Sequence, residues 1–348
     1  MTASIMITTR NRCSALQATC RRLVELQPQP KEVLICADGC TDGSVAMIKT
    51  EFPQFQLIEN EPAVGSVAAR HRLLTMATGD IVVSLDDDSY PTDKDFFARL
   101  PDAFAAYPEA AVITFPELRN GETSAPACEE AVFSLSSSLP RRSSAEAGGG
   151  EGWGEEALFN IPSDWFVGSV SSSVGRSLSG HYVSAYPNCA AAMRRDVYLK
   201  TGGYPPFFFH GYEEPDYALQ CYAAGYAVWF EPSLPIRHHL AAANRSPFRF
   251  HQSNARNEIW SVWLRCPWPW LPLVSLFRVW RQFRYACTEG WSWALQEPLW
   301  WVAALSGIGS CWRARRPLPW QIYFAWMRLA RNPIYTVSDL RQVFCRFR

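Results

Sequence analysis

The chain has 348 residues, of which 48% are hydrophobic and 19% charged, and its formal net charge is zero. This balance fits a globular protein of one or two domains and excludes a disordered chain. The charge is uneven, because residues 245–348 hold 15 Arg, no Lys and four acids, together with 12 of the 15 Trp. An acidic first part favours cation or phosphate chemistry, and a last part rich in Arg and Trp favours an anionic, partly apolar surface.

The eleven cysteines are scattered, without CxxC pairs or Cys/His metal spacing. This pattern favours a reducing compartment over a disulfide framework. Residues 1–12 lack a basic region followed by a long apolar run, so no cleaved signal is expected. No apolar run reaches the roughly 20 residues that a membrane-spanning helix needs. We therefore expect a cytoplasmic protein.

Short apolar runs and segments of helical spacing alternate along the first part of the chain. The expected strands are 4–8, 32–37, 55–59 and 80–85, and the expected helices are 12–26, 41–50 and 65–77. This alternation predicts an α/β fold with a mostly parallel sheet flanked by helices. Such sheets bind ligands at the carboxyl ends of their strands. The polar residues that fall at such ends are Thr8, Thr9 and Arg10, then Asp38, then Asp86, Asp87 and Asp88.

The pattern breaks down at 117–180, which is rich in Ser, Arg and Gly and is interpreted as a mobile insertion over the site. Order returns at 181–193, with helices expected at 196–200 and 214–224 and a strand at 227–231. We predict one domain over 1–240, made of 1–116, the insertion at 117–180 and a second part at 181–240. A helical region rich in Trp and Arg is expected over 241–348.

The three adjacent aspartates Asp86, Asp87 and Asp88 follow an apolar strand. Adjacent carboxylates repel one another, and a bound cation is the natural compensation. A hard divalent ion held by one or two carboxylates and by substrate phosphates fits Mg²⁺ or Mn²⁺. The alternative is an Asp-rich turn that caps the next helix.

Five segments in this order carry a family resemblance: ITTRNR (7–12), DGCTDGS (38–44), VGSVAARHRLLTMATGDIVVSLDDD (64–88), NCAAAMRRDVYLKTGGYPPFFFHGYEEPDYAL (188–219) and HH (238–239). The set resembles the bacterial-type family 2 glycosyltransferases, which have the A-type glycosyltransferase fold. The resemblance implies a nucleotide-sugar-binding half at 1–116 and a half for the acceptor and the base at 181–240.

The resemblance also implies roles at the donor site. Thr8, Thr9 and Arg10 match the loop against the nucleotide, Asp38 matches the acid that contacts the base, and Arg70 matches an Arg near the donor phosphates. Asp86 and Asp88 match the ends of the DxD motif, with Asp87 between them. Asp88 is the expected metal ligand, and Asp86 points toward the ribose or the donor sugar.

Two choices stay open at the other motifs. His238 resembles a downstream His that completes the metal or diphosphate site, and His239 is its rival. The acids Glu213, Glu214 and Asp216 resemble the family's Glu-Asp-x-Asp motif, in which the second acid is the general base. That position is Glu214, a Glu where the family has Asp, and Asp216 is the alternative base.

The tail alternates Trp with Arg, as in the segments 260–270, 278–284 and 312–316. Trp is typical of the membrane interface, and Arg is attracted to anionic lipid. In the family such a tail suggests a lipid-linked acceptor. The alternative is a helical subdomain whose Trp side chains are packed inside. Nucleic-acid binding is not expected, because the front part is acidic and nucleic-acid motifs are missing.

The sequence therefore predicts a metal-dependent, inverting hexosyl or deoxyhexosyl transfer from a nucleotide-sugar to a carbohydrate or lipid-linked acceptor. Synthesis of cell-surface polysaccharide or glycolipid is the expected setting, with peripheral contact at the inner face of an anionic membrane. One alternative is a nucleotidyltransferase, which would need a Gly-rich basic loop after the first strand. The other is a membrane-associated sugar-nucleotide binder without catalysis.

Overall fold

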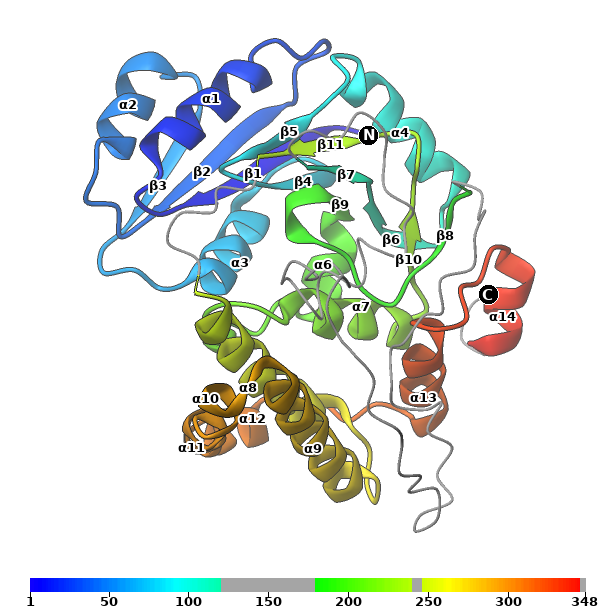
Figure 1. Cartoon of the computed structure of the whole chain (residues 1–348). Coiled ribbons are helices and arrows are strands. Elements are labelled where there is room, and N and C mark those ends of the chain that lie inside the picture. The colour runs from blue at the N-terminus through cyan, green and yellow to red at the C-terminus, as the bar shows by residue number, and fades with distance from the viewer. Residues whose placement is uncertain (120–178, 240–245, 345–348) are drawn as a thin grey trace, which may run out of the picture.

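The computed structural model describes residues 1–119, 179–239 and 246–344. A layered α/β unit lies above a group of helices from the last part of the chain (Figure 1). The predicted α/β fold with a helical C-terminal region is confirmed. Almost all of the insertion predicted at 117–180 lies outside the described residues.

The large sheet has eight strands in the order β3-β2-β1-β4-β9-β6-β10-β8. In chain order they are β1 (Ala3–Thr9), β2 (Glu32–Asp38), β3 (Gln56–Asn60), β4 (Ile81–Asp86), β6 (Ala110–Thr114), β8 (His181–Tyr182), β9 (Ala191–Arg194) and β10 (Ala227–Phe230). The first four strands of this order pair in parallel, while β9 runs antiparallel to β4 and to β6. The sheet is therefore mixed, with the parallel part at the end that the strand–helix alternation predicts.

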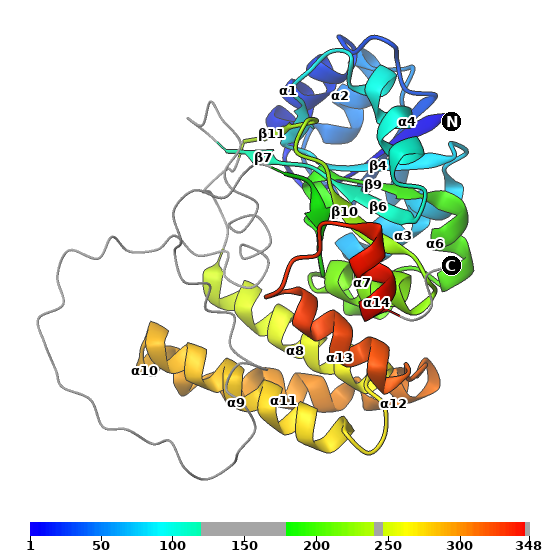
Figure 2. The ribbon, with the colours of Figure 1, turned by 90° about the vertical axis from the view of Figure 1, so that its right-hand side faces the viewer.

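Helices cover both faces of this sheet. In both views α1 (Cys13–Leu23), α2 (Ser44–Glu51) and α4 (Phe96–Ala106) lie on one side (Figures 1 and 2). On the other side lie α3 (Ser66–Met76), α6 (Arg195–Thr201) and α7 (Glu213–Ala223). Because both faces are covered, β1, β2 and β4 read as continuous apolar runs without polar alternation.

Helix α2 begins at Ser44, three residues later than the sequence predicts. The reason is Asp42, whose carboxylate accepts hydrogen bonds from the backbone N–H groups of Ser44 and Cys13, each at 3.0 Å. An Asp that bonds to the backbone two residues on forms a turn and delays the start of a helix.

A second, smaller sheet lies across the end of the first and has the order β5-β11-β7. Its strands are β5 (Ser89–Pro91), β7 (Glu117–Leu118) and β11 (Ile236–His238). In its register His238 stands opposite Ser89, the residue that follows the three aspartates. The small sheet thus brings a distant His to the end of β4.

The C-terminal helices are α8 (Pro247–Arg265), α9 (Leu271–Glu289), α10 (Trp291–Ala294), α11 (Glu297–Ser306), α12 (Ile308–Arg313), α13 (Trp320–Leu329) and α14 (Val337–Val343). Helices α9, α11 and α12 pack on α8, and a small apolar core forms there around Ile259 and Trp300. Helix α13 packs on α7, and its Trp326 Nε1 donates to the carbonyl oxygen of Ser184, just after β8, at 2.8 Å. The boundary proposed at residue 240 thus separates two parts that share extensive contacts.

None of the described helices is long and apolar enough to cross a bilayer.

Candidate active site at the strand ends

The ends of β1, β2 and β4 lie side by side, as the sequence predicts. Thr8 stands opposite Asp86 in the register of β1 and β4, and Thr9 stands opposite Ala37, the residue before Asp38. Thr8 is half-buried and Thr9 is buried, while Arg10 is exposed. The three polar strand ends therefore form one edge on which a ligand can rest.

Asp38 orders the loop that leads into α3. Its Oδ1 accepts a hydrogen bond from the N–H of Val64 at 2.9 Å and another from Asn60 Nδ2 at 3.0 Å. Its Oδ2 accepts from the N–H of Gly65 at 2.9 Å. The carboxylate thus holds the backbone of this loop, and its contact with a nucleotide base stays a prediction.

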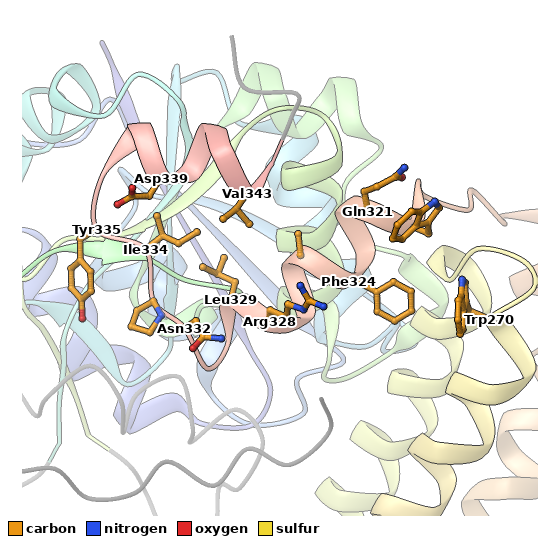
Figure 3. A pocket seen from close by; sticks show the side chains of 13 residues that line it. Trp270, Gln321, Phe324, Arg328, Leu329, Asn332, Ile334, Tyr335, Asp339 and Val343 are labelled. Carbon is orange, nitrogen blue, oxygen red and sulfur yellow. The ribbon is translucent and has the colours of Figure 1, made fainter. Parts of the chain in front are cut away.

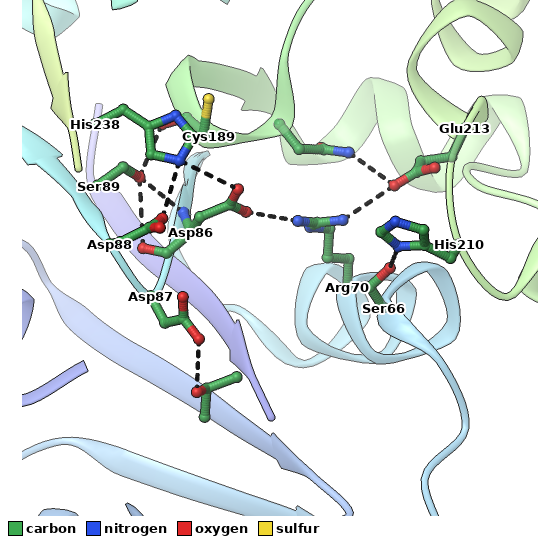
Figure 4. A network of polar contacts seen from close by, with 12 residues as sticks. Ser66, Arg70, Asp86, Asp87, Asp88, Ser89, Cys189, His210, Glu213 and His238 are labelled. Carbon is green, nitrogen blue, oxygen red and sulfur yellow. Dashed lines mark hydrogen bonds and ion pairs between the residues drawn. The ribbon is translucent and has the colours of Figure 1, made fainter. Parts of the chain in front are cut away.

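The three aspartates point in different directions (Figure 4). Asp87 turns inward, where Thr9 Oγ1 donates to it at 2.8 Å and Arg12 Nη1 lies 2.8 Å from its Oδ1. Burial raises the pKa of Asp87 to about 7, although Arg12 and Thr9 oppose the shift. Asp87 is therefore engaged in holding β4 against β1, and a direct contact with the donor stays a prediction.

Asp88 lies between Arg12 and His238. Its Oδ2 is 2.5 Å from Arg12 Nη2, and its Oδ1 is 2.9 Å from His238 Nε2. Burial alone would raise the pKa of Asp88, but the contacts with His238 and Arg12 lower it to about 2. Asp88 is thus ionised at neutral pH and can serve as a metal ligand. Arg12 lies in the ITTRNR segment, but the sequence does not indicate its role.

His238 faces the aspartates and His239 does not. The ring of His238 is buried, with Nδ1 2.7 Å from Glu117 Oε1 and Nε2 4.0 Å from Asp86 Oδ2. His239 is exposed and its Nε2 lies 2.8 Å from the hydroxyl of Tyr90. Burial would lower the pKa of His238, but Cys189, Asp88 and Glu117 around it raise the pKa well above its usual range.

The side chains at this point suit a hard divalent cation. One ligand atom each from Asp86, Cys189 and His238 lies within 4.8 Å of the others, and Asp88 adjoins His238. Burial raises the pKa of Cys189 to about 11, and a sulfur ligand is soft, so a hard divalent cation prefers the oxygen donors beside it. The donors left are carboxylate oxygens and one imidazole nitrogen, a set that Mn²⁺ accepts. Sequence analysis did not single out Glu117 and Cys189, which adjoin the His only in the folded chain.

Arg70 joins the aspartates to the start of α7 (Figure 4). Its Nη2 lies 2.7 Å from Asp86 Oδ1, and its Nη1 lies 3.0 Å from Glu213 Oε1. Asn188, in the short helix η2 (Asn188–Ala190), donates to the same oxygen of Glu213 at 3.0 Å. Arg70 therefore fixes the distance between Asp86 and α7, and its place near the donor phosphates stays a prediction.

The candidate bases Glu214 and Asp216 lie in different surroundings. Glu214 is 8% exposed, and burial together with the charge of Glu213 raises its pKa to about 8, against the opposing effect of Arg70. Asp216 is 1% exposed, and both of its oxygens are occupied. Its donors are Arg265 at 2.9 and 3.1 Å, Ser261 at 2.8 Å and Gln220 at 2.8 Å. A base needs a free lone pair for the incoming proton, and this condition favours Glu214.

A cavity of about 670 Å³ lies away from the strand ends, between α13 and the start of α9. Figure 3 shows Trp270 and Phe324 at one end of it, where their rings pack edge to face with centroids 5.5 Å apart, and Arg328 beside Phe324. This recess is aromatic and adjoins the C-terminal helices, so it is separate from the aspartates.

Residues 4–135 match the family described as Glycosyl transferase family 2. No curated protein sequence matches the chain. Among solved structures, TarS 1–349 of S. aureus in complex with UDP-GlcNAc is 16% identical, with a TM-score of 0.53 over 99% of this chain and 90% of that one. The mannosyltransferase PcManGT of Pyrobaculum calidifontis, in complex with GDP-Man and Mn²⁺, is 15% identical, with a TM-score of 0.51 over 94% and 85%.

A structure of GalNAc-T7 with UDP, GalNAc and Mn²⁺ is 17% identical, with a TM-score of 0.54 over 78% of this chain. The chain spans 49% of the length of that protein. The likeness to these three structures concerns the fold, and the sequence match over 4–135 concerns the family. The chain therefore carries a family 2 glycosyltransferase domain over residues 4–135, on the A-type glycosyltransferase fold.

Proposed function

We propose that this glycosyltransferase moves a hexosyl or deoxyhexosyl group from a nucleoside-diphosphate sugar to an acceptor hydroxyl, with inversion at the anomeric carbon. The observation that carries the proposal is Arg70, which ties the cluster of Asp86, Asp88 and His238 to the acids at the start of α7. The residues proposed to hold the cation and to act as the base thus lie near one edge of the sheet, and this nearness supports a site where a donor and an acceptor can meet.

Asp88 and His238 would hold the divalent cation, with Asp86 beside them facing the donor. When bound, this cation neutralises charge on the diphosphate leaving group. Glu214 accepts the proton of the acceptor hydroxyl as its oxygen forms a bond to the anomeric carbon. The bond from that carbon to the diphosphate oxygen breaks in the same step, so a single displacement inverts the configuration.

The first donors to test are UDP-GlcNAc and GDP-Man, because the solved relatives hold them. We expect Mn²⁺-dependent thermal stabilisation by one class of nucleotide-sugar, followed by release of the nucleoside diphosphate when an acceptor is present. Asp88→Ala should abolish both effects, and Asp95→Ala, at an exposed acid that follows the site, should abolish neither. An Asp88→Ala variant with unchanged turnover would rule out this mechanism.

Helices α9–α12 carry exposed apolar side chains that bear on the nature of the acceptor. Each of these helices packs against α8 or a neighbouring helix by one face, and each of α9–α12 or a residue next to it carries large apolar side chains that are exposed among the described residues. The exposed large apolar residues follow helical spacing, at Leu273, Leu276, Trp280 and Phe283 on α9, and at Leu295, Leu299, Val302, Leu305 and Ile308 on and around α11. We name these nine residues the apolar helix face.

Charge near the apolar helix face favours an anionic partner. Arg284 and Arg313 are exposed on α9 and α12, whereas Glu297 is fully buried and Glu289 is the one exposed acid of the described helices α9–α12. An apolar face with basic neighbours is typical of a helix that lies in the membrane interface. We propose that this face contacts an anionic membrane and that the acceptor is lipid-linked, as in cell-surface polysaccharide or glycolipid synthesis.

The sequence left open whether the Trp and Arg residues of the tail contact a membrane or pack inside a helical subdomain, and the structure contains residues of both kinds of surroundings, buried and exposed. Trp260, Trp300 and Trp326 are buried, and Arg265 and Arg278 pair with buried acids. These residues belong to the packed interior. Trp280, Trp291 and Trp312 are exposed and remain for the proposed membrane contact.

A further inference from the structure

Helix α8 presents a row of polar side chains to α7 and to the loop before it. They follow the spacing of one helix face, at Asn254, Asn257, Glu258, Ser261 and Arg265. Asn257 is fully buried, and the last three are nearly so. Buried polar groups lower stability unless they are paired, so their partners indicate what this row does. We name these five residues the polar stripe of α8. In both views α8 runs beneath α3 and α7 (Figures 1 and 2).

The loop that leads into α7 has a strained backbone. Phe209, Gly211 and Tyr212 have φ angles of 63°, 84° and 67°. Residues other than glycine rarely adopt such values, and they persist only where surrounding contacts hold them. Tyr212 is the last residue before α7, so this loop decides where the carboxylate of Glu214 lies.

Asn257 holds the loop from the side of α8. Its Nδ2 atom lies 3.0 Å from the carbonyl oxygen of Phe208, 2.8 Å from that of His210 and 2.7 Å from that of Gly211. Asn254 closes on the same glycine, where an added Cβ atom would come within 2.4 Å of its Oδ1. The two N–H groups of Asn257 are thus shared among three carbonyl oxygens of the strained loop, and Arg256 Nη2 also donates to that of Phe208 at 2.9 Å.

The opposite side of the loop rests on α3. The N–H of Val67 donates to the carbonyl oxygen of Phe209 at 3.2 Å, and a Cβ atom at Gly65 would lie 2.5 Å from that oxygen. Helix α3 also carries Arg70, which contacts Asp86. The loop is therefore clamped between the donor side of the site and α8.

The other buried residues of the polar stripe, Glu258, Ser261 and Arg265, contact α7 and the residue before it. Arg265 and Ser261 bind both oxygens of Asp216, which lies in the first turn of α7, two residues after the proposed base. Glu258 accepts a hydrogen bond from the hydroxyl of Tyr212 at 3.3 Å and pairs with Arg278 of α9 at 2.9 Å. Each contact is directional, so together they fix the start of α7 in both position and rotation.

We propose that the polar stripe of α8, through Asn257, positions Glu214 for proton removal, and that the C-terminal helices are thereby part of the catalytic apparatus. Asn257 is a positioning residue, because it acts on Glu214 through the loop. This inference rests on the proposed function for the role of Glu214. The hold of Asn257 on the loop can be measured without any turnover.

The test compares Asn257→Ala and Asn257→Asp with the unaltered chain. The Asp variant keeps the volume of the side chain but replaces the amide donor with an acceptor. We expect both variants to lose kcat by between about tenfold and a hundredfold, as a misplaced reacting group does. The donor KM should stay within about twofold, because the donor edge is untouched. Hydrogen–deuterium exchange should rise at the amides of 208–216.

The matched control is His251→Ala, which lies on the same helix and is also buried. Nε2 of His251 lies 2.7 Å from Glu297 of α11, away from the loop. We expect it to lower the unfolding temperature and to leave kcat and exchange at 208–216 unchanged. The proposal is overturned if the Asn257 variants keep their kcat and loop exchange, or if His251→Ala loses as much kcat as they do. An unaltered chain that turns over no nucleotide-sugar would defeat the proposed function instead, and loop exchange would still decide the hold of Asn257.

Discussion

Nδ1 of His238 lies 2.7 Å from Oε1 of Glu117, and this contact turns the other ring nitrogen toward Asp88. A carboxylate that accepts the Nδ1 proton holds the ring in the tautomer whose Nε2 can bind a metal. Glu117 therefore orients a proposed ligand without contacting the cation itself.

Replacing Glu117 with Ala should weaken Mn²⁺ binding by between about tenfold and a hundredfold, the usual effect of losing such a partner. Titration of Mn²⁺ against donor-dependent thermal stabilisation measures this affinity. Glu117→Gln keeps an oxygen that can accept a hydrogen bond from Nδ1 of His238, so this variant should lose much less Mn²⁺ affinity than Glu117→Ala. His239→Ala is the matched control, since its ring bonds to Tyr90, and equal losses of Mn²⁺ affinity in Glu117→Ala and His239→Ala would contradict the assignment of His238.

The raised pKa of Glu214 predicts a pH profile for transfer. Burial and the charge of Glu213 raise this pKa to about 8, so the carboxyl is mostly protonated at neutral pH. A general base must be ionised, and kcat should therefore rise as the pH increases through about 8 and level off above it. Glu214→Gln should lower kcat by at least about a hundredfold and remove this pH dependence while donor binding persists. A Gln variant that retains the same rising limb would exclude Glu214 as the base.

Asp216 should matter for stability rather than for the pH profile. Removing one partner of a buried ion pair costs about 3 to 5 kcal/mol of unfolding free energy, and Asp216→Asn leaves Arg265 buried without its counter-charge. Urea unfolding measures this loss. The exposed pair of Asp196 and Lys200 supplies the control, because Asp196→Asn should leave the midpoint almost unchanged. The rising limb in pH should survive in Asp216→Asn, and its disappearance would make Asp216 the base.

The apolar helix face predicts binding to anionic vesicles. We expect the unaltered chain to sediment with vesicles of phosphatidylglycerol and phosphatidylcholine, and less so as salt increases. Leu295→Asp combined with Leu299→Asp should abolish sedimentation, because both side chains are more than half exposed on that face. Leu199→Asp, at an exposed apolar residue of α6, should bind as the unaltered chain does. A chain that stays in solution with these vesicles would overturn the membrane proposal.

The periodic pattern of the sequence was enough to predict the fold. From β1 to β4, the strands and helices predicted from apolar runs and helical spacing agree closely with the observed ones. Hydrophobic periodicity is a local property of the sequence, because each element buries one face or stripe of its own residues. The same reasoning placed Thr9, Asp38 and Asp86 at one edge, because parallel strands end together. The predicted start of one helix was wrong by three residues, because the hydrogen bonds of the Asp42 carboxylate form a turn before α2.

The choice between neighbouring side chains was decided by the tertiary structure. His238 and Glu117 are 121 residues apart, and Asp216 and Arg265 are 49 apart. No local pattern indicates such pairs, because register and helix rotation determine which side chain turns inward. The sequence by itself thus determined a family 2 domain with acids at its strand ends. Only the folded chain decided which His faces them, which acid keeps a free lone pair, and that α8 holds the loop before Glu214. Those outcomes depend on contacts between elements that are distant in the chain.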